Sequence, residues 1–202
     1  MKNGFKILIA LVIVILMTAC SPETSNDNTK KIELGTWQDN IYTNNFLNIK
    51  YTLPDSWSVT TNDELAEHMK TDVDTLTDSN KLSELSVVYH FMVIDETTGN
   101  NVILLSEKDN VSSIRTYINS VKAQLKNVTT MKYTIGDEND ETINGIKYKT
   151  LEVDCNIENQ VLKQKYYIVK DNDYFTSIIV TNVTTNNLNF MNEVINSFEK
   201  LN

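Results

Sequence analysis

The chain has 202 residues, of which 41% are hydrophobic, and it carries 27 acidic against 18 basic side chains, a net charge of −9. This length suits one domain with its own hydrophobic core. An acidic protein repels the phosphates of nucleic acids, so we exclude DNA and RNA as partners. The chain has only two cysteines, which excludes a fold held together by several disulfides.

The first twenty residues have the pattern of a secretory signal that ends at a lipoprotein cleavage site. A basic start, an apolar run over Ile7–Met17 and two small residues precede Cys20. An apolar run of about eleven residues is shorter than the ~20 that a membrane-spanning helix needs. We therefore predict cleavage before Cys20 and acylation of its thiol, rather than an uncleaved anchor or an ordinary signal peptide with a chance cysteine. The lipid would hold the protein to the outer face of the cytoplasmic membrane.

A polar segment without apolar periodicity, Ser21–Lys31, follows this cysteine. We interpret 20–32 as the lipidated cysteine and a flexible tether with a typical end-to-end distance of ~18 Å, and 33–202 as a single domain. Loss of residues 1–19 removes two lysines, which brings the net charge to −11 and leaves Cys155 as the one unmodified thiol. The scarcity of arginine relative to lysine is typical of AT-rich coding and indicates a low-GC, Gram-positive bacterium.

The domain opens with a strand region over 36–53, in which apolar and polar residues alternate so that one face is buried. The apolar members of this alternation are Ile49, Tyr51 and Leu53. Thr61 and Glu64 fit a capping box, which predicts a short helix through Lys70. The polar stretch 71–80 is predicted to be a loop.

A hairpin and a helix occupy the middle of the chain. Val87–Glu96 and Val102–Glu107 are predicted to be strands, and the turn residues 97–100 between them favour antiparallel pairing. Ser112 or Ser113 can cap the helix that follows. Its apolar residues recur at helical spacing and are Ile114, Tyr117, Ile118, Val121 and Leu125.

The second half of the domain is predicted to be a run of strands that starts at 132–136. The turn dipeptides Asn144-Gly145 and Asn172-Asp173 divide this run into hairpins. The predicted strands are Ile146–Ile157, Val161–Lys170 and Tyr174–Thr181.

Two further details are predicted in this half. The apolar spacing shifts between Tyr148 and Leu151, which indicates a β-bulge near Thr150. A final amphipathic helix is predicted over 187–200. Strands joined by hairpins, with helices between them, together give an α+β class with an antiparallel sheet flanked by helices.

The motifs of the domain resemble those of small bacterial lipoproteins with the PsbP-like fold. The motifs are Gly35-Thr36-Trp37, Tyr42-Thr43-Asn44, the strand from Ile49 to Pro54 with Trp57, Asn144-Gly145-Ile146, Tyr166-Tyr167 and Ser197-Phe198. The resemblance covers about residues 33–201 and implies an α/β/α sandwich. Photosynthetic members of the family assist the water-oxidising complex and a eukaryotic relative binds a small GTPase, but no residue that carries either function can be transferred to this chain. Fold-level likeness is weak evidence for function.

Few residues offer catalytic chemistry. The two histidines are interpreted as a helix-surface residue, His68, and a sheet-face residue, His90. Cys155 and His90 could pair as nucleophile and base only by meeting across the sheet, and Cys155 shares the alternation of apolar residues. No phosphate-binding glycine loop and no serine elbow is present. We expect a protein that is not an enzyme, and keep a hydrolase that uses Cys155 or the acidic residues as a third hypothesis.

A dense acidic run, 137–141, offers oxygen ligands of the kind that calcium prefers. Its carboxylates are Asp137, Glu138, Asp140 and Glu141. The spacing does not fit an EF-hand, so a solvated acidic loop is the leading interpretation and weak Ca²⁺ binding the minority hypothesis. We predict no other metal site and no cofactor.

Large aromatic residues are the remaining candidates for a binding surface. They are Trp37, Trp57, Tyr166, Tyr167, Tyr174 and Phe175. They are core residues if helices cover both faces of the sheet, and line a pocket or partner surface if part of a face is open. The leading hypothesis is therefore a membrane-tethered, non-enzymatic interaction module that binds a protein partner or a small ligand. The alternative is an accessory subunit that binds a solute or metal ion for a membrane machine.

Overall fold

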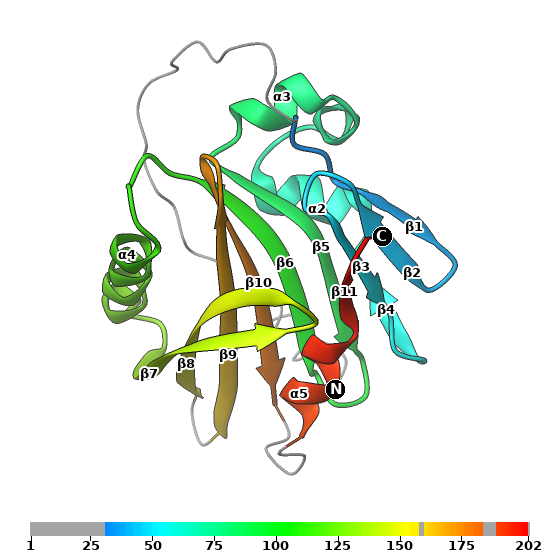
Figure 1. The fold of residues 1–202 in the computed structure, drawn as a ribbon. Coiled ribbons are helices and arrows are strands. Elements are labelled where there is room, and N and C mark those ends of the chain that lie inside the picture. Colours follow the sequence, from blue (N-terminus) through cyan, green and yellow to red (C-terminus); the bar gives the residue numbers. More distant parts are fainter. Residues whose placement is uncertain (1–30, 158–159, 184–188, 202) are drawn as a thin grey trace.

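The computed structural model describes residues 31–157, 160–183 and 189–201, which form two antiparallel sheets (Figure 1). The four-stranded sheet has the order β1-β2-β3-β11 and the seven-stranded sheet the order β4-β5-β6-β10-β9-β8-β7. The strands of the small sheet are β1 (Thr36–Gln38), β2 (Ile41–Asn44), β3 (Ile49–Thr52) and β11 (Phe198–Lys200). Those of the large sheet are β4 (Trp57–Val59), β5 (Val87–Asp95), β6 (Asn101–Lys108), β7 (Lys132–Ile143), β8 (Ile146–Ile157), β9 (Gln160–Asp171) and β10 (Tyr174–Asn182).

The helices lie on both sides of the large sheet. They are α2 (Asn62–Met69), the 3-10 helix η1 (Val73–Thr77), α3 (Ser79–Glu84), α4 (Ile114–Asn127) and α5 (Phe190–Asn196). None of the helices in the described part of the chain is long and apolar enough to span a bilayer. The predicted signal peptide, Cys20 and most of the predicted tether lie outside the described residues.

Each face of the large sheet has its own hydrophobic core. On one face, side chains from α2, α3 and α4 pack against the sheet in a cluster that includes Leu65, Leu82 and Ile118. On the other face, the small sheet and α5 contribute Tyr51 and Val194 to a second cluster. The α+β class with helices flanking an antiparallel sheet is therefore confirmed, and the second covering layer is mainly the small sheet.

Elements whose signals are local in sequence form where the sequence predicts them. Helix α2 begins with the predicted capping box, in which Glu64 N–H donates to Thr61 Oγ1 over 3.3 Å and Thr61 N–H donates to Glu64 Oε2 over 3.0 Å. Helix α4 begins after Ser113, whose Oγ accepts from the N–H of Thr116. Strands β5 and β6 form the predicted antiparallel hairpin.

The predicted loop over 71–80 is wrong, because this stretch contains η1 and the start of α3. Leu76 and Leu82 are buried in the first cluster, so the two short helices pack against the sheet. The Asp78 carboxylate accepts hydrogen bonds from the N–H groups of Asn80 and Lys81 and thereby caps α3. The stretch is polar overall, but burial of Leu76 within it and of Leu82 just after it is enough to hold the two short helices on the sheet.

The predicted final helix is too long at its carboxyl end. Helix α5 ends at Asn196, and Phe198–Lys200 form β11, which pairs antiparallel with β3. The edge of β3 offers unpaired backbone groups, and Phe198 packs on Tyr51 with ring centroids 4.5 Å apart. Strand pairing and burial of Phe198 therefore outweigh the helical periodicity of the segment.

The bulge predicted at Thr150 is also wrong. The pairing of β8 with β9 is continuous, and the register shift lies instead on β7, between Ile135 and Glu138. Tyr148 belongs to the second cluster and Leu151 to the first, so each faces a covered side of the sheet. Strand β8 is covered on both faces and therefore carries apolar residues on both. This explains the three-residue spacing of Tyr148 and Leu151 without a β-bulge.

Candidate functional site

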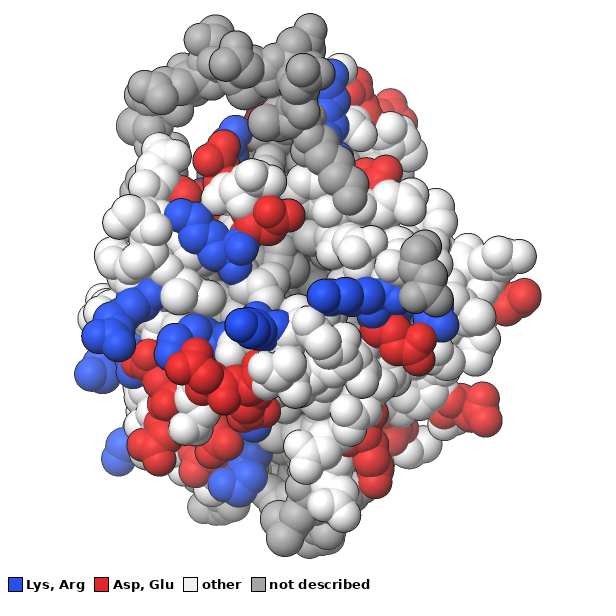
Figure 2. All heavy atoms as spheres, in the orientation of Figure 1, with Lys and Arg blue, Asp and Glu red and all other residues white. Residues whose placement is uncertain are grey.

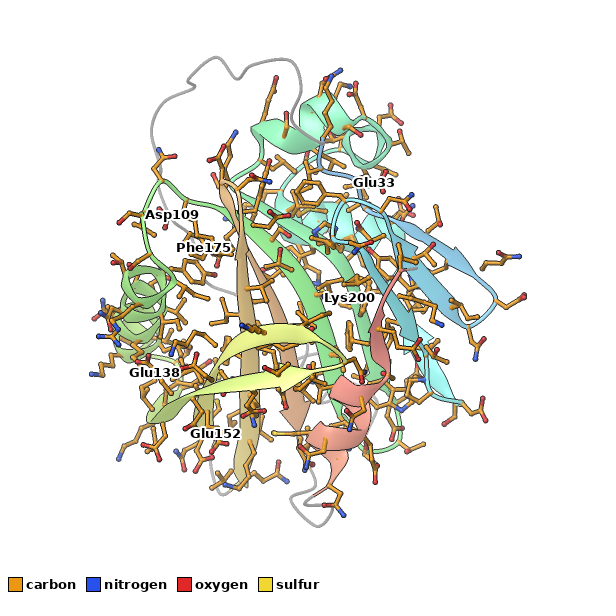
Figure 3. The ribbon with its side chains drawn as sticks, viewed as in Figure 1. Glu33, Asp109, Glu138, Glu152, Phe175 and Lys200 are labelled. Atoms are coloured by element: carbon orange, nitrogen blue, oxygen red, sulfur yellow. The ribbon has the colours of Figure 1, made fainter. Side chains whose placement is uncertain are left out.

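The acidic run 137–141 lies inside strand β7, so the prediction of a loop there is wrong. Side chains alternate between the two faces of a strand, and the four carboxylates do not converge on one point. Glu138 pairs with Lys122 of α4, Asp140 with Lys149 at 2.7 Å, and Glu141 with Lys165 at 2.7 Å. Figure 2 shows the acidic and basic side chains interspersed over the β7–β8 hairpin, and Figure 3 shows Glu138 on the side of α4.

The acidic residues therefore take part in ion pairs across the sheet surface. Within residues 31–157, 160–183 and 189–201, no group of three or more histidine, cysteine or acidic side chains is placed so that it could hold a metal ion. Asp137 lies at the register shift of β7, between the paired residues Ile135 and Glu138. The structure does not bring the residues of the calcium hypothesis together.

Cys155 and His90 lie on strands that do not neighbour each other. Three strands separate β8 from β5 in the sheet, which puts these two strands about 19 Å apart at the usual spacing of strands. The Cys155 thiol is buried 3.5 Å from the Met131 sulfur, and burial raises its pKa. The nucleophile–base pair considered from the sequence therefore does not form. His68 is half-buried on α2, near the ring of Tyr89.

His90 lies at a register irregularity of β5 and is only 2% exposed. Its Nδ1 is 3.0 Å from the carbonyl oxygen of Glu33, and its Nε2 is 2.8 Å from Ser106 Oγ, which in turn is 2.9 Å from Thr176 Oγ1. A carbonyl oxygen only accepts, so Nδ1 carries the proton and Nε2 accepts from the Ser106 hydroxyl. Burial lowers the pKa of His90 to about 4, which keeps the imidazole neutral.

The segment that enters the domain crosses this histidine and is fixed in place. Ile32 is 1% exposed within the first cluster, so the packed domain begins one residue before the predicted boundary at 33. The Glu33 carboxylate accepts from the N–H groups of Asn45 and Phe46 (Figure 3). Tyr42 OH donates to the carbonyl oxygen of Leu34. Residues 32–35 are called the entry segment below.

A cavity of about 420 Å³ lies between the entry segment, the β1–β2 hairpin, β5, η1 and the start of α2. Strand β4 pairs with β5 only from Val93 onward, so no described strand pairs with the earlier part of β5 on that side. The apolar lining residues are Leu34, Gly35, Trp37, Val59, Leu65, Leu76 and Phe91. The polar lining residues are Asp39, Tyr42, Thr60, Thr61, Asn62, Thr77 and His90.

Three aromatic rings form one wall of the cavity. The ring centroids of Trp37 and Tyr42 are 5.2 Å apart, those of Tyr42 and Phe91 4.7 Å, and those of Trp37 and Phe91 5.4 Å. Tyr42 and Phe91 are buried, whereas Trp37 is half-buried. Asp39, in the β1–β2 turn, is the one carboxylate among the described lining residues, and no lysine or arginine is among them.

Of the six aromatic residues selected from the sequence, Trp37 lines this cavity and the others pack elsewhere. Tyr166 and Phe175 are buried in the first cluster and Tyr167 in the second, as adjacent residues on opposite faces require. Trp57 and Tyr174 are partly buried at the margins of the two clusters.

Sequence reasoning missed Tyr42, Asn44 and Phe91 as neighbours of the site. Tyr42 and Asn44 are two residues apart on β2 and both are buried. Asn44 Nδ2 donates to Tyr42 OH and to the carbonyl oxygen of Glu33. An asparagine on the buried face of a strand needs such hydrogen-bond partners. The position of Asn44 on the same strand face as Tyr42 could therefore have predicted a buried polar contact from the sequence.

Protonation of His90 is expected to destabilise the protein in acid. Between pH 6.5 and 4 the unfolded chain binds a proton on this histidine that the folded protein does not, so stability falls as the pH falls, by about 3 kcal/mol over that range. In urea unfolding at pH 7 and 4.5, His90→Gln should show a smaller loss than the parent chain. The matched variant His68→Gln should keep the full loss, and an equal effect of both substitutions would contradict the assignment.

The similarity of this chain to known proteins is confined to its fold. No model of a known protein family matches the sequence, and no curated protein matches it. The solution structure of cyanobacterial PsbP (CyanoP) from Synechocystis sp. PCC 6803 matches with a TM-score of 0.53 and 10% identity, over 89% of this chain and 98% of that chain.

A second solved structure, of LpqN, involved in cell envelope biogenesis of Mycobacterium tuberculosis, matches with a TM-score of 0.43 and 12% identity, over 75% of this chain and 82% of that one. The TM-score of the match to the cyanobacterial protein establishes a common fold. Nearly its whole length is covered, and this confirms the fold that the motifs of the sequence indicated. The chain therefore has the PsbP-like fold.

Proposed function

We propose that this protein is a non-enzymatic binding module, held at the outer face of the cytoplasmic membrane by a lipid on Cys20, that takes up a small and largely apolar ligand. The observation that carries the proposal is the cavity of about 420 Å³ beside β5. Ligand sites are concave, range over roughly 300–1,000 Å³, and combine apolar walls with a few placed polar groups. The volume of the cavity lies within this range, and half of its lining residues are apolar.

The surroundings of the cavity support binding without rearrangement. His90, Tyr42 and Asn44 hold the entry segment through hydrogen bonds to the carbonyl oxygens of Glu33 and Leu34. Leu34 and Gly35 of that segment form part of the cavity wall. A wall that is fixed before the ligand arrives lowers the entropy lost on binding.

A thermal-shift screen of the full chain in detergent against small molecules tests this proposal. A ligand at 100 times its dissociation constant should stabilise the native state by ~2.7 kcal/mol and raise the melting temperature. Thr77 is exposed and lines the cavity, so Thr77→Trp should abolish the shift by filling the opening. The matched control Thr142→Trp, on exposed β7, should leave the shift unchanged.

If no compound gives a shift that depends on Thr77, the cavity is not a ligand site. Crosslinking on intact cells would then test the remaining hypothesis of a protein partner.

The anchor makes a separate prediction. Cys20→Ala removes the thiol that accepts the lipid, so the protein should leave the membrane fraction or stay unprocessed, with an unchanged melting temperature. Fractionation of cells followed by mass determination of the processed chain measures this. Ser21→Ala, next to the cysteine, is the matched control and should remain bound. A Cys20→Ala protein that is fully processed and membrane-bound would contradict the lipoprotein assignment.

A further inference from the structure

We infer that the ligand of this cavity is an organic cation: a quaternary or protonated ammonium group that carries an apolar body. The inference rests on the proposed function, because it names the ligand class of the same site. It follows from three observations on the lining residues: the aromatic wall, the sign of the charge, and the state of the polar groups.

The aromatic wall is the first observation. Trp37, Tyr42 and Phe91 lie within 5.4 Å of one another by their ring centroids and all three line the cavity. The faces of aromatic rings carry negative electrostatic potential and attract ammonium groups, with tryptophan the strongest of the three. Trp37 is also the least buried of the three rings, which leaves part of its surface open to a ligand.

The sign of the charge is the second observation. Asp39 gives the described lining residues a negative charge, and no lysine or arginine among them balances it. A carboxylate or phosphate ligand would be repelled by Asp39 and would find no lysine or arginine among these lining residues to pair with. An ammonium group would be attracted to Asp39. Asp39 is exposed, so its charge disfavours anions and favours cations to a modest degree.

Three polar donors that line the cavity are already engaged. The N–H of Thr61, at the start of α2, donates to the Glu64 carboxylate within the same helix turn. Tyr42 OH donates to the carbonyl oxygen of Leu34. His90 is held between the carbonyl oxygen of Glu33 and the hydroxyl of Ser106. None of these three donors is left for an anionic ligand.

The volume sets the size of the ligand. A water molecule takes about 30 Å³ of liquid, so a cavity of about 420 Å³ admits far more than a bare ammonium ion. The apolar lining from Leu34, Leu65 and Leu76 lies in the same cavity as the aromatic wall. An ammonium headgroup at the rings and Asp39, with a hydrocarbon or aryl body against the leucines, matches this distribution.

Calorimetric titration of the full chain in detergent with a cation and its neutral isostere tests the inference. The probes are benzyltrimethylammonium and neopentylbenzene, which have the same shape and differ in charge. The cation should bind at least tenfold more tightly. Asp39→Asn should weaken the cation three- to tenfold and leave the isostere unchanged, whereas Asp173→Asn, in the exposed turn before β10, should change neither.

Replacing the indole tests the aromatic wall separately. Trp37→Leu keeps apolar bulk but removes the ring, so it should weaken the cation about tenfold while the isostere loses less. Circular dichroism and the melting temperature of each variant establish that it is folded before titration.

The outcomes separate this inference from the proposed function. Equal or tighter binding of the isostere, or binding of phenylacetate in place of the cation, would overturn the cationic ligand and leave the cavity as a binding site. Absence of binding by every probe, together with no Thr77-dependent shift in the screen, would overturn both.

Discussion

Glu107→Gln is expected to stabilise the protein at pH 8 by roughly 2–4 kcal/mol. Glu107 is 3% exposed, beneath α4, and burial raises the pKa of its carboxyl to about 8, with the negative charge of Asp109 adding to the effect. Tyr117 OH donates to one carboxyl oxygen, and the other has no hydrogen-bond partner among the described residues. An ionised carboxylate in this position is unfavourable, so the folded state holds the proton.

The direction of the pH dependence follows from the difference between the folded and unfolded states. In the unfolded chain the Glu107 carboxyl loses its proton above pH ~4.5, whereas in the folded protein it keeps the proton up to about 8. The folded state therefore binds more protons between these values, and stability falls as the pH rises. A glutamine stays neutral throughout, so this fall disappears in the variant.

Urea unfolding at pH 5 and pH 8 measures the effect. The variant should be close to the parent chain at pH 5, within about 1 kcal/mol for the changed hydrogen bonds, and more stable at pH 8. Glu84→Gln, an exposed position at the end of α3, is the matched control and should leave the pH dependence as it is. If Glu107→Gln shows the same decline between pH 5 and 8 as the parent chain, Glu107 is ionised in the folded protein.

Glu107 and His90 act in opposite directions on stability. His90 lowers stability as the pH falls below 6.5, and Glu107 lowers it as the pH rises above ~4.5. Their contributions offset each other over the range that they share, roughly pH 4.5–6.5. The two groups alone therefore give a stability plateau in mild acid, with a decline on the acid side from His90 and on the neutral side from Glu107.

The sequence could predict those elements whose signals lie within a few residues of each other. The capping box of Thr61 and Glu64 and the cap at Ser113 are local contacts, so the starts of α2 and α4 follow from neighbouring residues. The strand Phe198–Lys200 depends on pairing with β3, some 150 positions earlier. The residues close to Phe198 in sequence therefore do not predict a strand. The acidic run likewise forms part of a strand, β7, because its carboxylates pair with lysines of α4, β8 and β9. These lysines are distant in sequence or on other elements, so the run alone does not predict a strand.

The same distinction explains what could be foreseen of the site. Trp37 could be selected as a candidate from the sequence because a large aromatic side chain contributes much apolar surface either to a core or to a binding site. The cavity beside it exists because β4 is only three residues long and because the entry segment crosses His90. Both are consequences of tertiary arrangement, and the alternation of polar and apolar residues does not encode them.

Gly35→Ala is expected to destabilise the protein by about 3 kcal/mol and to remove the ligand binding that we propose for the cavity. Gly35 has a φ of +84°, a conformation that side-chain-bearing residues adopt at a cost of ~1–2 kcal/mol. A Cβ at this position would lie 2.5 Å from the carbonyl oxygen of Thr43 and 2.6 Å from Tyr42 OH. Thr43 belongs to the paired backbone of β2, so the entry segment rather than the strand must move.

Movement of the entry segment has consequences beyond Gly35 itself. It would break the hydrogen bond from Tyr42 to the carbonyl oxygen of Leu34 and displace the cavity wall that Leu34 and Gly35 form. Gly145→Ala is the matched control, because Gly145 has a φ of +75° but its Cβ would meet only the Lys200 amine, at 3.9 Å. It should lose about 1 kcal/mol, for conformation alone. Urea unfolding gives the difference between the two variants, and a loss for Gly35→Ala no larger than that for Gly145→Ala would mean that the entry segment is not held against β2.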